Sequence, residues 1–305
     1  MQILVLGSAA GGGFPQWNCH CRMCRSVRKG ASRAVPRTQS SIAVSDDGDN
    51  WVVINASPDI RQQINASPRL TRVEGARGSA IGAVVVTDAQ IDHTTGLLIL
   101  REGLPLALYC TPEVAEELTT SYPILSMMKH WDGGYETHTV DIHSPEGWRI
   151  PAVPHLAFHP VSLSSNAPPF SPYRNRARPG DNIGLKIVDT RSGATLFYAP
   201  GLGAPEASVL AAMEEADCVM MDGTLWTDDE MIREGVGTSL GSEMGHLSVS
   251  GDDGMLALME GFTKPRKVLI HINNTNPILD PDSPQHQAVL DAGVEIAFDG
   301  MTIEI

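Results

Sequence analysis

Three cysteines stand within a span of six residues, in the segment Cys19-His-Cys-Arg-Met-Cys24. Thiolates at this spacing can converge on one soft cation, and sulfur-rich tetrahedral ligation favours Zn²⁺. Three free surface thiols would instead be open to oxidation. Because a catalytic zinc keeps an open position and three thiolates suppress Lewis acidity, we predict a structural zinc at Cys19, Cys21 and Cys24. His20 points away from this set if side chains alternate, so the fourth ligand stays open, with the segment around His271 as one source.

A second group of ligand-type side chains follows the apolar run Ala83–Thr87. The chain continues Asp-Ala-Gln-Ile-Asp-His, which puts Asp92 and His93 on the connection between a strand and a helix. Open α/β sheets place their chemistry at the carboxyl ends of strands. Late in the chain another apolar strand, Val268–Ile272, delivers His271 at its end, before an amide-rich turn. An ordinary pair of loop residues is the alternative for Asp92 and His93.

Two further side chains are candidates for the same site. Asp222 ends an apolar strand and opens the turn Asp-Gly-Thr224, where it could be a metal ligand, accept a hydrogen bond from one, or cap the turn. His246 stands in Met-Gly-His-Leu-Ser just before a helix, where an imidazole could act as an acid or a base. A packed loop histidine is the alternative for His246, and the sequence does not separate the two.

One long irregular stretch, Pro160–Asp181, is rich in Ser, Asn and Pro. A loop of this length in a compact domain is more often a lid or a rim than filler. It carries Tyr173, Arg174, Arg176 and Arg178, which could receive a carboxylate-bearing ligand. A solvated basic turn is the alternative.

The elements that must position these residues are short strands, with helices between some of them. The predicted strands are Gln2–Leu6, Ser41–Val44, Trp51–Asn55, Ala83–Thr87, Leu106–Cys110, Gly184–Val188, Leu196–Ala199, Cys218–Met221, Val268–Ile272 and Val294–Phe298. The predicted helices are Pro112–Thr120, Pro205–Ala216, one that begins near Ser250, and Ser283–Ala292. Strands come first in pairs and then alternate with helices, which predicts two sheets covered by helices on their outer faces.

Composition excludes several classes of function. The 305 residues carry 22 Lys and Arg against 36 Asp and Glu, a net charge of −14, so a nucleic acid partner is not expected. No run approaches the ~20 apolar residues of a membrane span, and no targeting segment is visible. The odd count of five cysteines fits a metal site in a reducing cytoplasm. Cys110 and Cys218 lie in apolar runs and read as buried, inert thiols.

Three segments together carry a family resemblance: GSAAGGGFPQWNCHC at 7–21, TDAQIDHTTGLL at 87–98 and IHINNTNPIL at 270–279. They resemble the pyrroloquinoline quinone (PQQ) biosynthesis B family of the metallo-β-lactamase superfamily, and the likeness spans most of the chain. The resemblance implies one domain over residues 1–305. Its fold would be an αββα sandwich, two mixed β-sheets flanked by helices, with the metal site at one edge between the sheets.

The departures from the superfamily pattern concern its metal ligands. The segment after Thr87 resembles the H-x-H-x-D-H motif, with Asp88 and Gln90 where the first two histidines normally stand and with Asp92 and His93 at the last two positions. A hydrolase of this superfamily polarises a water between two zinc ions. The loss of two histidines therefore argues against that activity.

Two more hydrolase ligands are missing. The third histidine is expected in Pro160–Asp181, where none occurs, and Pro200 occupies the place of the bridging aspartate. The ligands that the resemblance leaves are Asp92, His93 and His271. Two histidines and one carboxylate are the ligand set of the metal site in non-haem Fe(II) oxygenases, which leaves positions on the iron open for O₂ and substrate.

The cysteine triplet also resembles the structural zinc motif of a phosphonate-pathway phosphodiesterase in the same superfamily. The fourth ligand there is a histidine three residues past the last metal histidine. The same offset from His271 falls on Asn274 in this chain. The resemblance therefore makes the Asn274 amide a candidate fourth ligand.

The resemblance implies a cytoplasmic enzyme of PQQ biosynthesis, in which Fe²⁺ with O₂ as co-substrate hydroxylates the tyrosine ring of a cross-linked Glu-Tyr precursor. The loop arginines would receive the substrate carboxylates. One alternative is a non-catalytic carrier that transports PQQ or its precursor, although a carrier needs no such trio of ligands. Another is a mononuclear zinc hydrolase. A second copy of the chain and other PQQ-pathway proteins are candidate partners.

Overall fold

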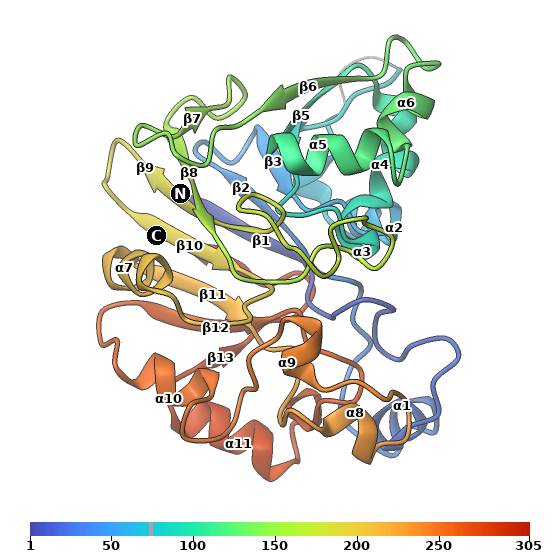
Figure 1. Cartoon of the computed structure of the whole chain (residues 1–305), viewed down its shortest axis with the longest axis vertical. Coiled ribbons are helices and arrows are strands. Elements are labelled where there is room, and N and C mark those ends of the chain that lie inside the picture. Colours follow the sequence, from blue (N-terminus) through green and yellow to red (C-terminus); the bar gives the residue numbers. More distant parts are fainter. Residues whose placement is uncertain (73–75) are drawn as a thin grey trace.

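The structure, a computed structural model, describes residues 1–72 and 76–305. In this part of the chain two seven-stranded sheets pack face to face (Figure 1). The first sheet consists, in spatial order, of β14 (Thr302–Glu304), β1 (Gln2–Gly7), β2 (Ser41–Ser45), β3 (Trp51–Ile54), β4 (Ile81–Val85), β5 (Leu106–Cys110) and β6 (Tyr135–Thr139). The second consists of β13 (Glu295–Ile296), β12 (Arg266–Ile270), β11 (Cys218–Asp222), β10 (Thr195–Ala199), β9 (Ile183–Asp189), β8 (Leu156–Ser162) and β7 (Trp148–Arg149).

Both sheets are mixed in the same way. In the first, β14, β1, β2 and β3 pair antiparallel, whereas β3, β4, β5 and β6 pair parallel. In the second, β7 to β10 pair antiparallel and β10 to β13 parallel. Because parallel strands end at the same edge of a sheet, β4 and β12 each deliver the residues that follow them to such an edge.

Three apolar layers hold the sheets and helices together. Between the sheets, Val5, Ile42 and Val85 of the first pack with Leu185 and Leu196 of the second. The alternate side chains of the central strands point to the outer faces, where helices cover them. This double burial explains why β3 is apolar at every position and β11 at every position before its last residue, Asp222.

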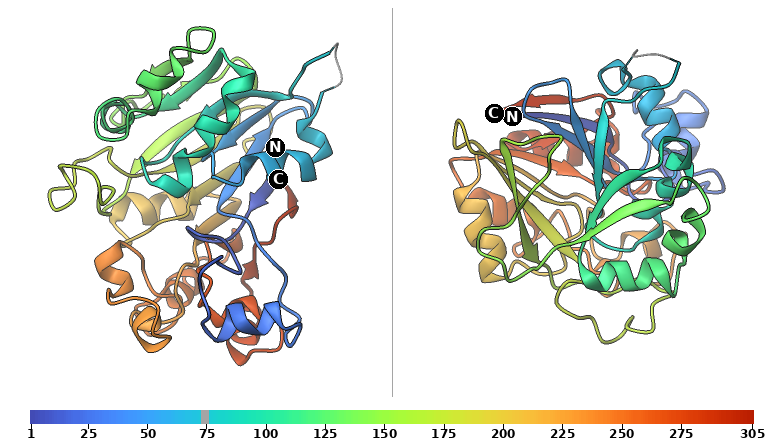
Figure 2. Two further views of the ribbon diagram at one scale, coloured as in Figure 1. Left: turned by 90° about the vertical axis from the view of Figure 1, so that its right-hand side faces the viewer. Right: turned by 90° about the horizontal axis from the view of Figure 1, so that it is seen from above.

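Helices cover both outer faces, as Figure 2 shows from two further directions. Over the first sheet lie α2 (Ile60–Ala66), α3 (Ile91–Thr94), α4 (Gly96–Ile99), α5 (Pro112–Thr119) and α6 (Ile124–Met128). Over the second lie α7 (Ala207–Glu215), α10 (Met255–Glu260) and α11 (Pro284–Asp291), with α1 (Arg22–Arg28), α8 (Glu230–Arg233) and α9 (Gly241–Met244) at one end. None of the described helices is long and apolar enough to cross a bilayer.

The predicted αββα sandwich is confirmed, and most of the predicted strands are present within one or two residues. The helix expected near Ser250 begins only at Met255, because Asp252 and Asp253 form a turn before it. The prediction missed β6, whose sequence YETHT is almost wholly exposed and lacks an apolar face. It also missed β8, which runs from apolar into half-buried positions at the start of the long loop.

Candidate functional site

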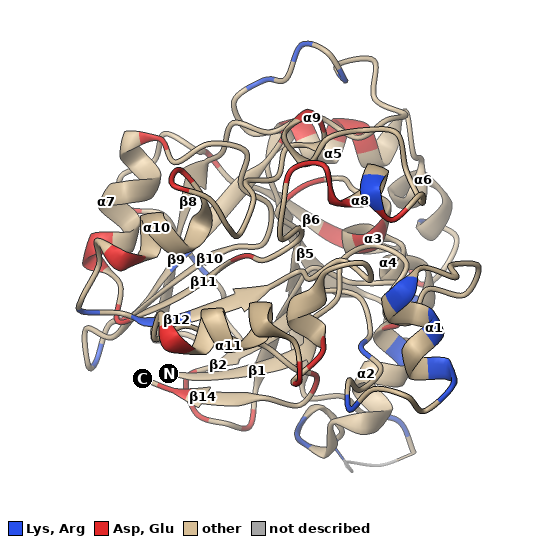
Figure 3. Cartoon of the chain, turned by 90° about the horizontal axis from the view of Figure 1, so that it is seen from below, with Lys and Arg blue, Asp and Glu red and all other residues tan. Residues whose placement is uncertain are grey.

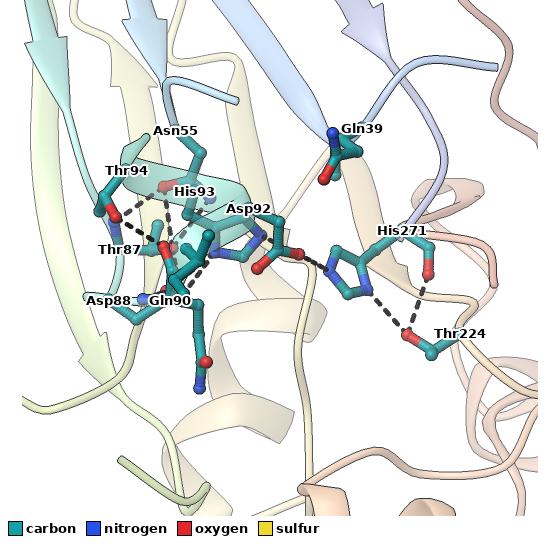
Figure 4. A network of polar contacts seen from close by, with 12 residues as sticks. Gln39, Asn55, Thr87, Asp88, Gln90, Asp92, His93, Thr94, Thr224 and His271 are labelled. Carbon is teal, nitrogen blue, oxygen red and sulfur yellow. Dashed lines mark hydrogen bonds and ion pairs between the residues drawn. The ribbon is translucent and has the colours of Figure 1, made fainter. Parts of the chain in front are cut away.

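The carboxyl ends of β4 and β12 meet across the two sheets and bring three ligand-type side chains together. Oδ2 of Asp92 lies 3.2 Å from Nε2 of His271 and 3.9 Å from Nε2 of His93 (Figure 4). The three ligand atoms all lie within 4.8 Å of one another. The predicted set of two histidines and one carboxylate is therefore a real cluster in space, and its donor atoms are those of a metal site.

His271 reaches the cluster through an unusual backbone conformation. Its φ of 61° is in the left-handed region, which a residue other than glycine seldom adopts. This turn ends β12 at Ile270 and directs the imidazole toward Asp92 (Figure 4). Strained backbone of this kind is concentrated at functional sites.

The backbone of the glycine-rich segment passes close to the cluster from the other side. A Cβ on Gly11 would stand 3.2 Å from Oδ2 of Asp92. A larger residue at this position would therefore press on the carboxylate. Gly11 therefore allows the backbone to pass close to the Asp92 carboxylate.

Asp88 fixes the orientation of His93. Its two oxygens lie 2.9 and 2.8 Å from Nδ1 of the imidazole, and it also accepts hydrogen bonds from Gln90 N and the Thr87 hydroxyl. Nδ1–H therefore points to Asp88, and Nε2 is left facing the cluster. That Nε2 is buried and has no hydrogen-bond partner in the structure. A buried nitrogen lone pair directed at a carboxylate and a second imidazole is what a metal cation would satisfy.

The charges around His93 favour a cation at this position. Burial lowers the pKa of His93, but the carboxylates of Asp88 and Asp92 outweigh it and raise the pKa to about 9. Burial would raise the pKa of Asp92, yet His93 and His271 hold it well below its usual range. Either a proton or a metal ion can supply the positive charge that these carboxylates require.

Thr224 and Asp222 orient two further imidazoles, those of His271 and His246. The Thr224 hydroxyl donates to Oδ1 of Asp222 over 2.5 Å and lies 2.9 Å from Nδ1 of His271, which can donate to it and so direct its Nε2 toward Asp92. Oδ2 of Asp222 lies 2.7 Å from Nδ1 of His246 and accepts from Leu202 N. Both Asp222 oxygens are thus engaged, which makes this buried residue one that orients the imidazoles.

His246 lies against the cluster, as the sequence allowed. Its ring stacks on that of His271 with centroids 5.4 Å apart. His246, His271 and Asp222 form a second group whose ligand atoms lie within 4.8 Å of one another. With Nδ1 held by Asp222, Nε2 is the ring atom left for a ligand in the cavity.

The roles of Asp88 and Thr224 were not predicted. Asp88 was noted only as a residue in place of a lost histidine ligand, and Thr224 only as part of a turn. A carboxylate five residues before a histidine, across a strand-to-helix connection, is the signal that could have indicated the first contact. No local signal could have indicated the contact between Thr224 and His271, which joins different strands.

The three cysteines of the predicted zinc site also converge. Cys19, Cys21 and Cys24 are buried, and their Sγ atoms lie within 4.8 Å of one another. Nδ2 of Asn274 lies 3.2 Å from Sγ of Cys19 and 3.3 Å from that of Cys24. A half-turn of the amide would bring Oδ1 to the same place. Asn274, the predicted fourth ligand, therefore lies beside the three thiols.

The thiols at this site depend on a cation for deprotonation. Burial raises the pKa of Cys21 to about 12, and the neighbouring Cys19 and Cys24 thiols add to the effect. A bound metal reverses this balance because thiolates are its ligands. Burial likewise raises the pKa of Cys110 and of Cys218 to about 12, in keeping with the inert role predicted for them.

One turn carries residues of both ligand clusters. The segment 271–276 begins with His271 of the first cluster and reaches Asn274 of the cysteine site three residues later. Glu230, buried on α8, accepts a hydrogen bond from Thr275 in the same turn and another from Trp226 N at 2.6 Å. The turn is further joined to the chain that leads to the cysteines, because Ile272 O accepts from Ala10 N at 2.9 Å.

A cavity of about 300 Å³ opens beside the first cluster. Asp92, His93, His246 and His271 lie in its wall, next to the apolar side chains of Leu163, Met231 and Met244. Gln90, in the place of a superfamily histidine, also lines it, and Figure 4 shows its amide directed away from the other polar groups. The cavity can hold a small ligand against the cluster.

Of the four residues predicted to receive a carboxylate, all within the described structure, only Arg174 lines this cavity. Arg178 is ion-paired with Glu116 and Asp181 and lies 3.6 Å from the centre of the Tyr173 ring. Arg176 is exposed and does not line the cavity. The structure therefore places Tyr173, Arg176 and Arg178 away from the cavity.

The fold and the histidine–carboxylate cluster define a member of the β-lactamase superfamily, and the model of the β-lactamase superfamily domain matches residues 50–272. Coenzyme PQQ synthesis protein B of Pseudomonas putida strain GB-1 is 56% identical over 305 residues, all of both chains. The protein of that name from Klebsiella pneumoniae is 53% identical and matches all of this chain and 98% of its own. This chain belongs to the coenzyme PQQ synthesis protein B family.

Solved structures agree with this assignment. The Zn²⁺-bound PqqB from Methylobacterium extorquens superposes with a TM-score of 0.90 at 39% identity, with both chains fully covered. A diphosphatase of the PhnP family superposes with a TM-score of 0.67 at 19% identity, covering all of this chain and 96% of its own. The second likeness concerns the fold alone.

Proposed function

We propose that this protein is an Fe(II)-dependent hydroxylase that acts in PQQ biosynthesis on the tyrosine ring of a cross-linked Glu-Tyr precursor. Its family membership supports the pathway. The observation that supports the reaction is the cluster of Asp92, His93 and His271, in which Nε2 of His93 is buried without a hydrogen-bond partner among the described residues. Three protein ligands would leave open positions on a bound iron for O₂ and substrate.

The positions that a two-zinc hydrolase needs argue in the same direction. Asp88, where the first histidine of the pattern would stand, holds Nδ1 of His93, and Gln90 stands at the second. Pro200, in place of the bridging aspartate, lies in the cavity wall without a ligand atom. A second zinc ion would therefore lack the ligands that hold it in the hydrolases.

Asp92, His93 and His271 would hold the metal ion, and a bound Fe(II) would supply the activation of O₂. Asp88 and Thr224 keep the two imidazoles in the tautomer that presents Nε2. The apolar wall of Leu163, Met231 and Met244 excludes water and gives an aromatic ring a surface to pack on. Each hydroxylation inserts one oxygen atom into a ring C–H bond and reduces the other to water, which takes two electrons and two protons from an added reductant.

Oxygen uptake by the iron-loaded protein tests this proposal. We expect anaerobically Fe(II)-loaded protein, given the Glu-Tyr substrate and a reductant, to consume O₂ and yield a product heavier by oxygen atoms. His271→Ala should abolish the uptake, whereas His143→Ala, at an exposed position, should not change it. Tight binding of PQQ with no O₂ uptake under any reductant would refute the hydroxylase and leave a carrier.

A further inference from the structure

Arg174 is a cation in the cavity wall that forms no ion pair with any of the described carboxylates. Its Nη1 donates to the backbone oxygen of Ala167 over 2.7 Å, and no ion pair with a described residue engages the rest of the guanidinium. Arg178, four residues on, is by contrast neutralised by both Glu116 and Asp181. A guanidinium carries five N–H donors in a planar fork. The N–H donors of Arg174 that do not contact Ala167 are therefore available to a ligand.

The loop holds Arg174 in place before any ligand arrives. The hydroxyl of Ser171 donates to the buried Glu117 of α5 and accepts from Tyr173 N at 2.9 Å. Arg174 N donates in turn to the backbone oxygen of Ser171 at 3.2 Å. Further along, the Thr111 hydroxyl donates to the backbone oxygen of Gly180 at 2.7 Å. The loop is thus fixed to α5 on both sides of Arg174, which lowers the entropy lost on binding.

The charge distribution makes a local cation necessary for an acidic ligand. The net charge is −14, and basic side chains gather on α1, which contributes nothing to the cavity wall (Figure 3). Asp88 and Asp92 add negative charge inside the cavity itself. Arg174 is the one Lys or Arg among the described residues that line it. A carboxylate that enters this cavity therefore finds its ion-pair partner at Arg174.

We propose that Arg174 is the carboxylate-binding residue of this cavity, and that the ligands it selects are aromatic acids. Their ring lies against Leu163, Met231 and Met244, and a carboxylate pairs with the guanidinium. This inference deepens the proposed function, because it names the group that aligns the substrate ring with the metal cluster. The binding itself does not depend on oxygen chemistry, so the two proposals fail separately.

The test is the affinity for PQQ, an aromatic tricarboxylic acid, measured on the metal-loaded protein without oxygen. We expect Arg174→Gln to weaken PQQ binding by about 10- to 100-fold, the loss of a charge-assisted bidentate pair. PQQ trimethyl ester should bind equally well to the wild type and to this variant, because the ester offers no carboxylate. Arg176→Gln is the matched control on the same loop and should bind PQQ normally.

Equal PQQ affinity in Arg174→Gln and the wild type would overturn the inference, as would an equal loss in Arg176→Gln or for the ester. Circular dichroism and bound metal verify that the variant is folded. Arg174→Lys provides a second variant: the charge is kept and the fork is lost, so an intermediate affinity is expected, and wild-type affinity would contradict bidentate binding. If PQQ binding depends on Arg174 but no O₂ is consumed, carboxylate recognition stands and the hydroxylase falls.

Discussion

Oδ2 of Asp88 lies 2.8 Å from Nδ1 of His93, at the position where the superfamily pattern has a metal-ligating histidine. The Asp88 carboxylate is not part of the cluster; it orients the imidazole of His93, which is. A hydrogen bond of this kind fixes the tautomer of the imidazole and raises the basicity of the opposite nitrogen. Compared with the superfamily pattern, the cluster therefore lacks one metal-ligating histidine, and the residue in its place fixes the orientation of His93.

Replacing Asp88 with Asn should weaken metal binding at the cluster while leaving the fold intact. The amide keeps the size of the side chain but removes the charge that supports His93, and loss of such a partner lowers metal affinity by about 10- to 100-fold. Competition with a chromophoric chelator, after the cysteine site has been filled with zinc, measures this affinity. Asp252→Asn changes an exposed carboxylate and should have no effect. An unchanged affinity in Asp88→Asn would show that the contact is dispensable.

The two cation sites should be separable by mutation. Cys24→Ser should remove the zinc at the cysteines, and His271→Ala the metal at the cluster, so that each variant loses about one metal ion per chain from a wild-type content of two. Cys110→Ser, which changes a buried thiol that belongs to neither ligand set, is the control and should retain both ions. Metal analysis of protein dialysed against a weak chelator gives these contents. A wild-type content in Cys24→Ser would refute the zinc site.

The buried Glu230 should make stability depend on pH. Burial raises its pKa from 4.5 to about 7, and hydrogen bonds from Thr275 and Trp226 only partly offset this. Between these pH values the folded chain keeps a proton on Glu230 that the unfolded chain releases. The contribution of this group to the free energy of unfolding is therefore fully present below pH 4.5 and is lost as the pH rises through 7. The full loss is on the order of 3 kcal/mol.

Urea unfolding of the wild type and Glu230→Gln at pH 5 and pH 8 tests this expectation. The amide resembles the protonated acid, so the two proteins should have similar stabilities at pH 5. At pH 8 the variant should be the more stable one, because it has no charge to bury. A stability difference that is the same at both pH values would contradict the assignment to Glu230.

The position of the metal cluster could be predicted because parallel strands end at one edge of a sheet. Asp92, His93 and His271 each follow an apolar strand, and a resemblance identified them as the ligands that remain. The hydrogen bonds that orient them could not be predicted in this way. The contact between Thr224 and His271 depends on the packing of β11 beside β12, which no local pattern contains.

The long loop shows a second limit of the sequence. Four side chains of suitable type occur within six residues, and their spacing does not distinguish Arg174 from Arg176 and Arg178. Contacts with α5 determine which arginine faces the cavity, because Glu116 forms an ion pair with Arg178 and Glu117 accepts a hydrogen bond from Ser171. The edge strand β6 was missed for a related reason: its exposed polar residues form a strand only because β5 pairs with them.

The turn 271–276 carries residues of both predicted cation sites, so we expect the occupancies of the two sites to be thermodynamically linked. A cation at Cys19, Cys21, Cys24 and Asn274 would restrict the turn that carries His271, so an ion that binds at the cluster afterwards would cost less conformational entropy. Linkage makes this cooperativity reciprocal: each ion raises the affinity for the other by the same factor. Removal of zinc from the cysteines would thus lower the affinity for a metal ion at the cluster that contains His271.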